Sequence, residues 1–401
     1  MSEKALICTV CESRYPFRTS FSRCPKCNEP LELEEIGTGS IKAEAYFNIF
    51  RRYGEFFPFR ERYDELDLGE GMTPLVWTPA LAKKYGIGAV AFKNETANPT
   101  WSFKDRGTAT ALRHAKILGF SRIGTVSTGN MAASVAAFGA KAGVETTILV
   151  SSDIPSEKLN PIAIYHPRLI RVHGDYSRLY SESLRLGEEL GIYFMNSDVP
   201  FRVEGSKTIA FEICEQTSFR VPDFVIVPTS AGGNIRGIEK GFREFYKVGL
   251  IARIPTIVCV QAEGCSPIVK AFEKKSLVVE RFSNPHTIAH AIENPFPPSG
   301  NQVLRVLNKN SGIALAVSDE EILAAQKELA ETGLFVQPAS ASSLAALKRL
   351  VHDGALKSNH CVVCVLTGSG LKYTSVFQHH HLAVEECDIS QLKPCLSHSI
   401  S

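Results

Sequence analysis

The 401-residue chain carries 44 Lys and Arg against 42 Asp and Glu, so its formal net charge is only +2. This balance provides no basic field for nucleic acid or a membrane surface, and no apolar run is long enough for a membrane helix. The N-terminal residues lack the apolar core of a signal peptide, and 11 cysteines without a secretion signal indicate reduced thiols. We therefore expect a cytoplasmic, globular protein of two or three domains.

The first residues contain two pairs of cysteines, each with the spacing of a metal-binding turn. Cys8 and Cys11 form one pair, and Cys24 and Cys27 form the other. Four thiolates on two facing turns supply a tetrahedral zinc site, and four protein ligands leave no open position for catalysis. We predict a zinc-ribbon-like segment over residues 1–36 with a structural zinc ion. The alternative is a ribbon that has lost its metal.

A short linker and a segment rich in aromatic and charged residues come next. The linker covers residues 37–40, and the aromatic segment covers residues 41–67. Arginines interleaved with aromatic rings could contact nucleic acid, but the chain has no wider basic field to support that function. We expect this segment to be a helix that packs on the main body.

From residue 69 onward, short β-rich runs alternate with amphipathic helical stretches. The runs are apolar and β-branched, as in strands that are buried on both faces. This pattern predicts an α/β fold with doubly wound, mostly parallel sheets in two subdomains, with ligands at the carboxyl ends of the strands. The predicted strands cover residues 89–93, 122–127, 146–151, 169–173, 192–195, 223–228, 256–261 and 361–366. The predicted helices cover residues 105–118, 130–142, 176–190, 205–217, 234–246, 318–332 and 340–352.

Lys104 occupies the turn between the first of these strands and the first helix. Asn98 and Pro99 mark the turn, and we expect Ser102 to cap the helix. The start of a helix and a buried environment both favour the neutral amine of a lysine, which is the form that attacks an aldehyde. Taken alone, a lysine is more often a solvated surface residue.

Small and polar residues follow several other predicted strands. Residues 127–130 open a helix, a pattern that is by itself more often a helix cap than a site. Residues 196–205 alone would be a surface turn with a solvated Arg202. Residues 229–234 expose consecutive backbone amides that suit phosphate, although their glycine spacing is not that of a dinucleotide-binding fold. Cys361 and Cys364 lie inside an apolar run, where we expect no redox or metal role.

Several motifs in a fixed order connect these turns, and they cover residues 69–75, 98–106, 127–130, 210–213, 260–264, 338–341 and 367–372. This series resembles the threonine synthase family, pyridoxal-phosphate (PLP) enzymes of the tryptophan-synthase-β-like fold, PLP fold type II. The resemblance implies a large PLP-binding subdomain over residues 41–128 and 206–378 and a smaller mobile subdomain over residues 129–205. Residues 379–401 are left as a tail. A homodimer is a further expectation from the resemblance.

The resemblance also implies a role for individual residues. Lys104 is the catalytic lysine that binds PLP covalently, Asn130 bonds the phenolic oxygen of PLP, and Thr367 faces its pyridine nitrogen. The cofactor phosphate is held by the turn that contains Ser230, Ala231, Gly232, Gly233 and Asn234. The substrate is held by Ser127 and Thr128 at its carboxylate and by Asn196, Ser197 and Arg202 at its phosphate. An arginine fork with polar partners suits a phosphate dianion.

The resemblance therefore implies a threonine synthase reaction, in which O-phospho-L-homoserine and water give L-threonine and phosphate. Three residues depart from the family pattern, namely Trp101, Met131 and Ala231. They leave open a related β-replacement or elimination enzyme that acts on O-phosphoserine, serine or threonine. A catalytically silent binding module is a third alternative, against which the intact Lys104 argues.

Overall fold

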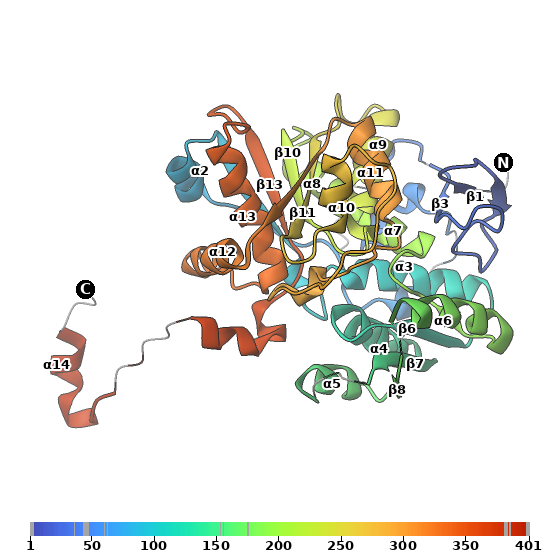
Figure 1. Cartoon of the computed structure of the whole chain (residues 1–401), viewed down its shortest axis with the longest axis horizontal. Coiled ribbons are helices and arrows are strands. Elements are labelled where there is room, and N and C mark those ends of the chain that lie inside the picture. Colours follow the sequence, from blue (N-terminus) through green and yellow to red (C-terminus); the bar gives the residue numbers. More distant parts are fainter. Residues whose placement is uncertain are drawn as a thin grey trace.

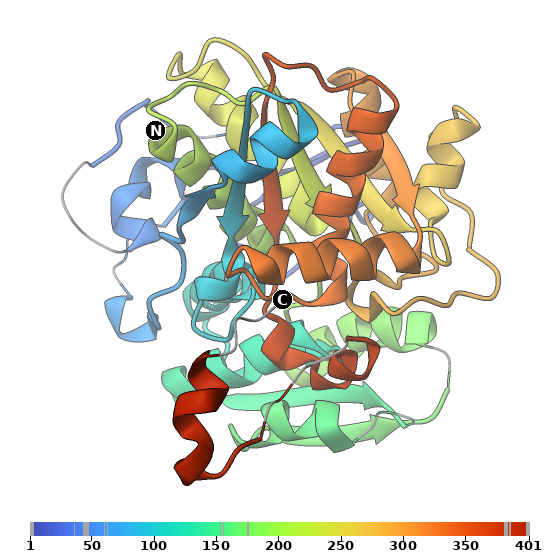
Figure 2. The same ribbon diagram turned by 90° about the vertical axis from the view of Figure 1, so that its left-hand side faces the viewer.

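Three β-sheets organise the described part of the chain (Figures 1 and 2). A small sheet lies near the N-terminus, and a six-stranded and a four-stranded sheet form the body. In Figure 2 the four-stranded sheet and its helices lie below the six-stranded sheet. The computed structural model describes residues 4–35, 37–42, 48–59, 61, 63–152, 154, 156–174, 176–380, 384 and 386–397.

The N-terminal sheet is antiparallel and has the strand order β2-β1-β3. Its buried side chains Leu6, Leu31 and Leu33 belong to the same core as helices of the body. The N-terminal segment therefore shares its core with the rest of the protein. The strands are β1 (Ala5–Cys8), β2 (Arg14–Pro16) and β3 (Leu31–Leu33).

The six-stranded sheet has the order β12-β11-β10-β13-β5-β4, and it is parallel except for β4. Alternate residues of each central strand enter different cores: Val225 and Val227 face one, and Ile226 faces the other. Because both faces are buried, the predicted doubly wound arrangement is confirmed for this sheet. The strands are β4 (Leu75–Trp77), β5 (Ala89–Asn94), β10 (Phe224–Pro228), β11 (Thr256–Ala262), β12 (Ile313–Val317) and β13 (Cys361–Leu366).

The four-stranded sheet is parallel throughout, with the order β8-β7-β6-β9. Its residues Ile123 and Ile148 are fully buried in the core that also holds the N-terminal sheet. All four strands fall within one or two residues of the predicted runs. They are β6 (Arg122–Val126), β7 (Glu145–Ser151), β8 (Arg168–Val172) and β9 (Tyr193–Phe194).

Helices cover both faces of the six-stranded sheet and pack around the four-stranded sheet. One face carries α1 (Ile49–Arg52), α8 (Thr208–Gln216), α9 (Gly233–Lys247), α10 (Pro267–Glu273) and α11 (Gly300–Lys309). The other face carries α2 (Pro79–Tyr85), α12 (Asp319–Glu331) and α13 (Pro338–His352). Around the four-stranded sheet lie α3 (Lys104–Ile117), α4 (Asn130–Ala142), α5 (Ser156–Ala163), α6 (Tyr176–Leu190) and α7 (Pro200–Ser206).

Two helix predictions were wrong in extent. The helix expected over residues 205–217 is two helices, because α7 ends at Ser206 and α8 begins at Thr208. Proline is favoured at the first position of a helix, and Pro200 occupies that position in α7. The segment predicted as a turn therefore carries Arg202 on a buried helix.

The aromatic segment at 41–67 was also expected to be one helix. Among its described residues only α1 is α-helical, followed by short 3₁₀ turns. The predicted packing on the body is confirmed, since Tyr53, Phe56 and Phe57 are buried in the core beneath the six-stranded sheet. Tyr46 and Phe47 lie outside the described residues.

The C-terminal residues were expected to be less regular than the body. After residue 380 the described residues include one short helix, α14 (Leu392–Ser397), which lies apart from the body in Figure 1. Among the described residues, no helix combines the length and the apolar character that a membrane crossing requires.

Candidate active site

The loop that carries Lys104 is held against the end of β13. The Phe103 amide donates to the Thr367 carbonyl at 3.1 Å, and the Ser369 amide donates to the Trp101 carbonyl at 3.0 Å. Trp101 has a φ of 62°, a left-handed conformation in which a side chain is strained and glycine is not. Ser102 was expected to cap α3, but this prediction was wrong: its buried hydroxyl has no hydrogen-bond partner, and Phe103 precedes the helix.

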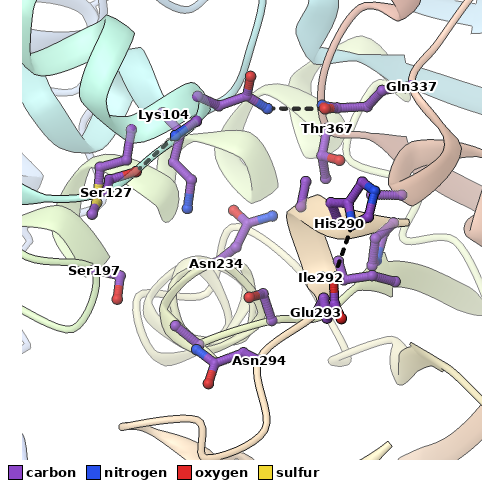
Figure 3. A pocket seen from close by; sticks show the side chains of 18 of the residues that line it. Lys104, Ser127, Ser197, Asn234, His290, Ile292, Glu293, Asn294, Gln337 and Thr367 are labelled. Carbon is purple, nitrogen blue, oxygen red and sulfur yellow. Dashed lines mark hydrogen bonds and ion pairs between the residues drawn. The ribbon is translucent and has the colours of Figure 1, made fainter. Parts of the chain in front are cut away.

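Lys104 is the first residue of α3, and its amine points into a cavity (Figure 3). Burial lowers the pKa of Lys104 to about 7, and the positive charge of Arg202 lowers it further. Because the usual value is above 10, a large share of the amine is neutral near neutral pH. A neutral amine is a nucleophile and a proton acceptor, so the chemistry predicted for this lysine is available at this position.

The cavity measures about 590 Å³ and lies at the carboxyl ends of strands from both larger sheets. Its wall includes residues that follow β5, β6, β9, β10 and β13. The predicted site residues that line it are Lys104, Ser127, Thr128, Asn130, Ser197, Arg202, Ser230, Ala231, Gly232, Gly233, Asn234 and Thr367. The structure therefore brings together residues that are up to 263 positions apart in the sequence (104 to 367).

Arg202 lies beside Lys104, and the hydrogen bonds of its guanidinium go to neutral groups. Its guanidinium donates to the Thr108 hydroxyl at 3.0 Å and to the Lys104 carbonyl at 3.3 Å. Burial lowers the pKa of Arg202 to about 10, and Asp105 and Tyr193 offset this only in part. Among the described residues, no carboxylate forms an ion pair with it. A buried cation at a cavity wall without a counterion is suited to bind an anion.

Asn196 is the predicted site residue that does not line the cavity. Its side-chain oxygen accepts from the Val126 amide at 3.0 Å, and its side-chain nitrogen donates to the Ser183 hydroxyl at 3.0 Å. The residue is fully buried and its amide is used inside the fold. It fixes the end of β6, from which Ser127 and Thr128 continue into the cavity.

The turn between β10 and α9 exposes unpaired polar atoms to the cavity. Gly232 has a φ of +95°, and an added Cβ would lie 2.8 Å from Val303 Cγ2, so only glycine fits there. Both polar atoms of the buried Asn234 side chain lack a hydrogen-bond partner in the described part of the chain, and Figure 3 shows this side chain in the cavity. The turn also leads into the N-terminus of a 15-residue helix, where backbone amides favour an anion.

Two residues without a predicted role bond to predicted site residues, and one of them, Gln337, lines the cavity. The Asn130 side chain donates to the Gln337 side-chain oxygen at 3.1 Å (Figure 3). The Thr367 and Ser340 hydroxyls are 2.9 Å apart. Gln337 and Ser340 lie at the start of α13, within or next to the motif at 338–341. The motif therefore indicated this region of the chain, but it assigned no role to either residue.

Another part of the cavity wall, a loop between α10 and α11, was not predicted from the sequence. His290 Nδ1 lies 2.9 Å from Glu293 Oε2, and both side chains face the cavity in Figure 3. Lys372 follows β13, donates to the Thr100 carbonyl at 2.6 Å, and has a pKa lowered to about 8 by burial. No periodicity or turn signal distinguishes His290 and Glu293 from surface residues of ordinary loops, whereas Lys372 ends the motif at 367–372, which implied no role for it.

Comparison with known proteins bears on the chemistry of this cavity. The family of pyridoxal-phosphate dependent enzymes matches residues 66–368. The chain belongs to this family.

Relatives within the family include threonine synthases. The threonine synthase of Methanocaldococcus jannaschii is 42% identical over 349 residues, which are 86% of each chain. That of Methanosarcina acetivorans is 36% identical over 373 residues, 92% of each chain. That of Halalkalibacterium halodurans is 38% identical over 327 residues, 81% of this chain and 89% of the relative.

Solved structures share the fold at low identity. Threonine deaminase isoform 2 from Solanum lycopersicum has a TM-score of 0.63 at 19% identity, covering 81% of this chain and 82% of that one. An L-serine ammonia-lyase from Rhizomucor miehei has a TM-score of 0.66 at 21% identity, covering 78% and 99%. The predicted α/β architecture is thus confirmed by enzymes that share little of the sequence.

The cofactor of the family fits the observed groups. Pyridoxal phosphate carries an aldehyde, for which the depressed pKa of Lys104 supplies a reactive amine. It also carries a phosphate, for which the unpartnered Asn234 side chain and the amides of the Gly232 turn supply donors.

The three departures from the family pattern differ in their position. Met131 and Ala231 line the cavity, and Met131 is buried at the start of α4. Trp101 is not among the lining residues, and 52% of its surface is exposed. Met131 and Ala231 therefore border the space where a substrate would bind, and Trp101, the largest of the three residues, does not.

The four predicted metal ligands lie together at one end of the N-terminal sheet. The Sγ atoms of Cys8, Cys11, Cys24 and Cys27 are all within 4.8 Å of one another. The separations are 3.4 Å for Cys8 and Cys27, 3.5 Å for Cys11 and Cys24, and 3.6 Å for Cys11 and Cys27. Tetrahedral zinc with Zn–S bonds of about 2.3 Å separates its sulfurs by roughly 3.8 Å. The donor set and its spacing fit zinc.

Proposed function

We propose that this protein is a threonine synthase, which converts O-phospho-L-homoserine and water into L-threonine and phosphate. Relatives with this name match 81% to 92% of the chain. The observation that carries the proposal is Arg202, a buried cation without an acidic partner among the described residues, beside the lysine of the cavity. A phosphorylated substrate supplies the missing negative charge.

In this proposal the residues of the large sheet hold the cofactor. Lys104 binds the aldehyde of PLP, and the turn from Ser230 to Asn234 holds its phosphate. Asn130 bonds the phenolic oxygen, and the Thr367 hydroxyl faces the pyridine nitrogen. When bound, pyridoxal phosphate supplies an electron-withdrawing ring that stabilises negative charge on the substrate carbons.

Residues around the smaller sheet bind the substrate. Ser127, Thr128 and neighbouring amides hold its carboxylate, and Ser197 and Arg202 hold its phosphate. Lys104 Nζ accepts and returns the protons of the substrate carbons, which its lowered pKa permits near neutral pH. Residues 129–205 close over the substrate and exclude water until water is needed at Cβ.

Asn196 takes a different role from the one that the resemblance implied. Because its amide is bonded to Val126 and Ser183, we propose that it positions the 127–130 turn and does not contact phosphate. An Asn196 variant would then weaken binding of the substrate carboxylate more than binding of its phosphate, as measured with inhibitors that carry only one of these groups.

A second candidate is a β-replacement or elimination enzyme on O-phosphoserine, serine or threonine. Its support is Met131, which adds bulk to the cavity wall. Serine and threonine carry no phosphate, so they would leave Arg202 without a counterion, which favours the phosphorylated substrates.

A substrate panel on PLP-loaded protein tests the proposal. The panel contains O-phosphohomoserine, O-phosphoserine with sulfite or sulfide, threonine and serine, and it follows phosphate and amino-acid products together. We expect phosphate release matched by threonine from O-phosphohomoserine. Turnover of another substrate with none of O-phosphohomoserine would refute the assignment and identify Met131 and Ala231 as marks of a different specificity.

We also propose that Cys8, Cys11, Cys24 and Cys27 bind one structural zinc ion. The clustered sulfurs and the absence of an open ligand position support this role. Metal analysis of protein purified without chelator should give about one zinc per chain. Protein that lacks metal while all four thiols are reduced would contradict it.

A further inference from the structure

The second cysteine turn of the N-terminal sheet touches two loops of the body. Arg23, which precedes Cys24, donates from one guanidinium nitrogen to Asp198 at 2.9 Å and to the Pro298 carbonyl at 2.8 Å. Its other terminal nitrogen donates to the Asn28 carbonyl at 2.5 Å, within the turn itself. The Asp198 side chain is completely buried, and 23% of the Arg23 side chain is exposed.

Each of these loops continues directly into the cavity. Ser197, which precedes Asp198, lines the cavity, and an added Cβ on Gly233 would lie 2.6 Å from its carbonyl oxygen. Ser299, which follows Pro298, donates from its amide to the Ala231 carbonyl at 3.0 Å. Arg23 therefore bonds to the residue next to Ser197, which lies in the cavity wall. Two hydrogen bonds, one to Pro298 and one from Ser299, connect it to the 230–234 turn.

Further contacts of the same N-terminal segment converge on the same region. Arg236 of α9 donates to the Ser299 hydroxyl at 3.0 Å and to Glu32 at 3.3 Å. Glu29 accepts from Gln302 and, at 3.3 Å, from Asn301, both in the first turn of α11. The segment from Arg23 to Glu32 thus contacts the loop before α7, the start of α11 and the side of α9.

We propose that Arg23 is a positioning residue of the active site, through which the cysteine-bearing turn sets the separation between the 197–198 loop and the 298–299 loop. The first loop belongs to the proposed substrate phosphate site and the second supports the proposed cofactor phosphate turn. The proposal rests on the function proposed above for Ser197 and the 230–234 turn. It gives the N-terminal segment a part in phosphate binding, although none of its residues lines the cavity.

The physical basis is that one planar guanidinium serves acceptors on three separate chain segments. Only its fixed fork holds Asn28, Asp198 and Pro298 in one arrangement. Loss of Arg23 leaves the buried Asp198 carboxylate without its ion-pair partner, and the loop must move to hydrate it. A displacement of about 1 Å in a binding group can reduce a rate up to roughly one hundredfold.

The test compares Arg23→Ala with Arg14→Ala in the full-length, PLP-loaded protein. Arg14 is a matched control, because it forms a 2.8 Å ion pair with Glu34 on the same sheet but is 56% exposed and contacts neither loop. We expect Arg23→Ala to raise KM for O-phosphohomoserine roughly tenfold or more with a smaller change in kcat. Arg14→Ala should stay within about twofold of the wild type.

Two additional readouts separate positioning from general damage. Arg23→Ala should keep the zinc content of the wild type, and added guanidinium ion at millimolar concentration should lower its KM towards the wild-type value. Arg23→Lys, which keeps the charge but not the fork, should give an intermediate KM. If Arg23→Ala loses zinc or fails to fold, Asp198→Asn removes the same ion pair from the side of the body and should raise KM in the same direction.

The affinity of the apoprotein for PLP tests the proposal without any substrate. Arg23→Ala should raise the Kd for PLP several-fold, because the 298–299 loop supports the cofactor phosphate turn. If the wild type does not turn over O-phosphohomoserine, the proposed function fails while this measurement still tests Arg23. Zinc-loaded Arg23→Ala with KM and PLP affinity within twofold of the wild type would overturn the positioning role.

Discussion

Two buried arginines near Lys104 have opposite surroundings. Arg106 donates to Glu95 at 2.6 Å and to Glu212 at 2.8 Å, and both carboxylates are fully buried. Burial lowers the pKa of Arg106, but Glu212 and Glu95 outweigh it, so the pKa is raised. Arg202 is almost as deeply buried, has no ion-pair partner among the described residues, and its pKa falls to about 10.

The comparison distinguishes an arginine whose charge is neutralised within the fold from an arginine whose charge can bind a ligand. The Arg106 network joins α3, α8 and the 3₁₀ turn that follows β5, and its charges are paired without any ligand. Among the residues that the structure describes, the Arg202 guanidinium donates only to neutral acceptors, so the fold retains a desolvated positive charge that an anion can neutralise. Burial alone does not distinguish the two arginines, but their partners do.

A Lys104 variant should give the largest effect. Lys104→Ala removes the amine that we propose to bind the PLP aldehyde and to move protons, so activity should fall by roughly 10² to 10⁴-fold or more. Borohydride reduction followed by mass spectrometry should detect PLP attached to the wild type and none on the variant. Lys158→Ala, a second cavity lysine, is the control and should keep the attached cofactor. An unchanged PLP absorption spectrum in Lys104→Ala would contradict the assignment.

Arg106→Met should next show the structural role of the paired arginine. It leaves Glu95 and part of the Glu212 charge buried without a partner, so the free energy of unfolding should fall by about 3–5 kcal/mol. Chemical denaturation of both variants at the same pH measures this. Equal stability of Arg106→Met and Arg202→Met would remove the distinction between the two residues.

Arg202→Met should show the reverse behaviour. The free energy of unfolding should be unchanged or higher, since no buried carboxylate loses its partner. The KM for O-phosphohomoserine should rise roughly tenfold to one hundredfold, because a hydrogen bond to a charged group contributes about 1.5–3 kcal/mol. Binding of inorganic phosphate, measured by calorimetry, should weaken in parallel. Unaltered phosphate binding in a folded variant would exclude Arg202 from the anion site.

The smallest effect concerns pH. Uptake of PLP by the apoprotein requires neutral Lys104, so its rate should rise with pH through about 7, the lowered pKa of this group. A neighbouring positive charge favours the neutral amine, and removing it raises the pKa of the lysine. The profile of Arg202→Met should therefore move to higher pH, although burial, the larger cause, remains. A profile that stays in place would show that Arg202 does not act on Lys104.

The sequence predicted the parts of the site that belong to turns after apolar strands. Lys104, Gly232 and Thr367 each follow such a strand, so parallel pairing alone places them at one edge of the sheet, where the strands end. The two cysteine pairs could also be recognised in the sequence as metal ligands, because such ligands need a fixed local spacing.

Features that depend on packing between distant segments could not be predicted. Asn196 looked like a ligand-binding residue, and only the tertiary structure places its amide on Val126 and Ser183. The His290 and Glu293 pair lies in a loop without periodicity. β12 is an edge strand, and β4 has only three residues, so both gave weak signals. Lys207, which is fully buried, lies at the junction of α7 and α8, and no local preference in the sequence indicates a junction there.

Trp101 gives this protein an internal optical probe. It is one of only two tryptophans in the chain, it is half exposed, and it lies three residues before Lys104. The other, Trp77, lies on the edge strand β4. Tryptophan emission overlaps the absorption of lysine-bound pyridoxal phosphate, so energy transfer from Trp101 can report cofactor loading and movement of the lysine loop without an added label.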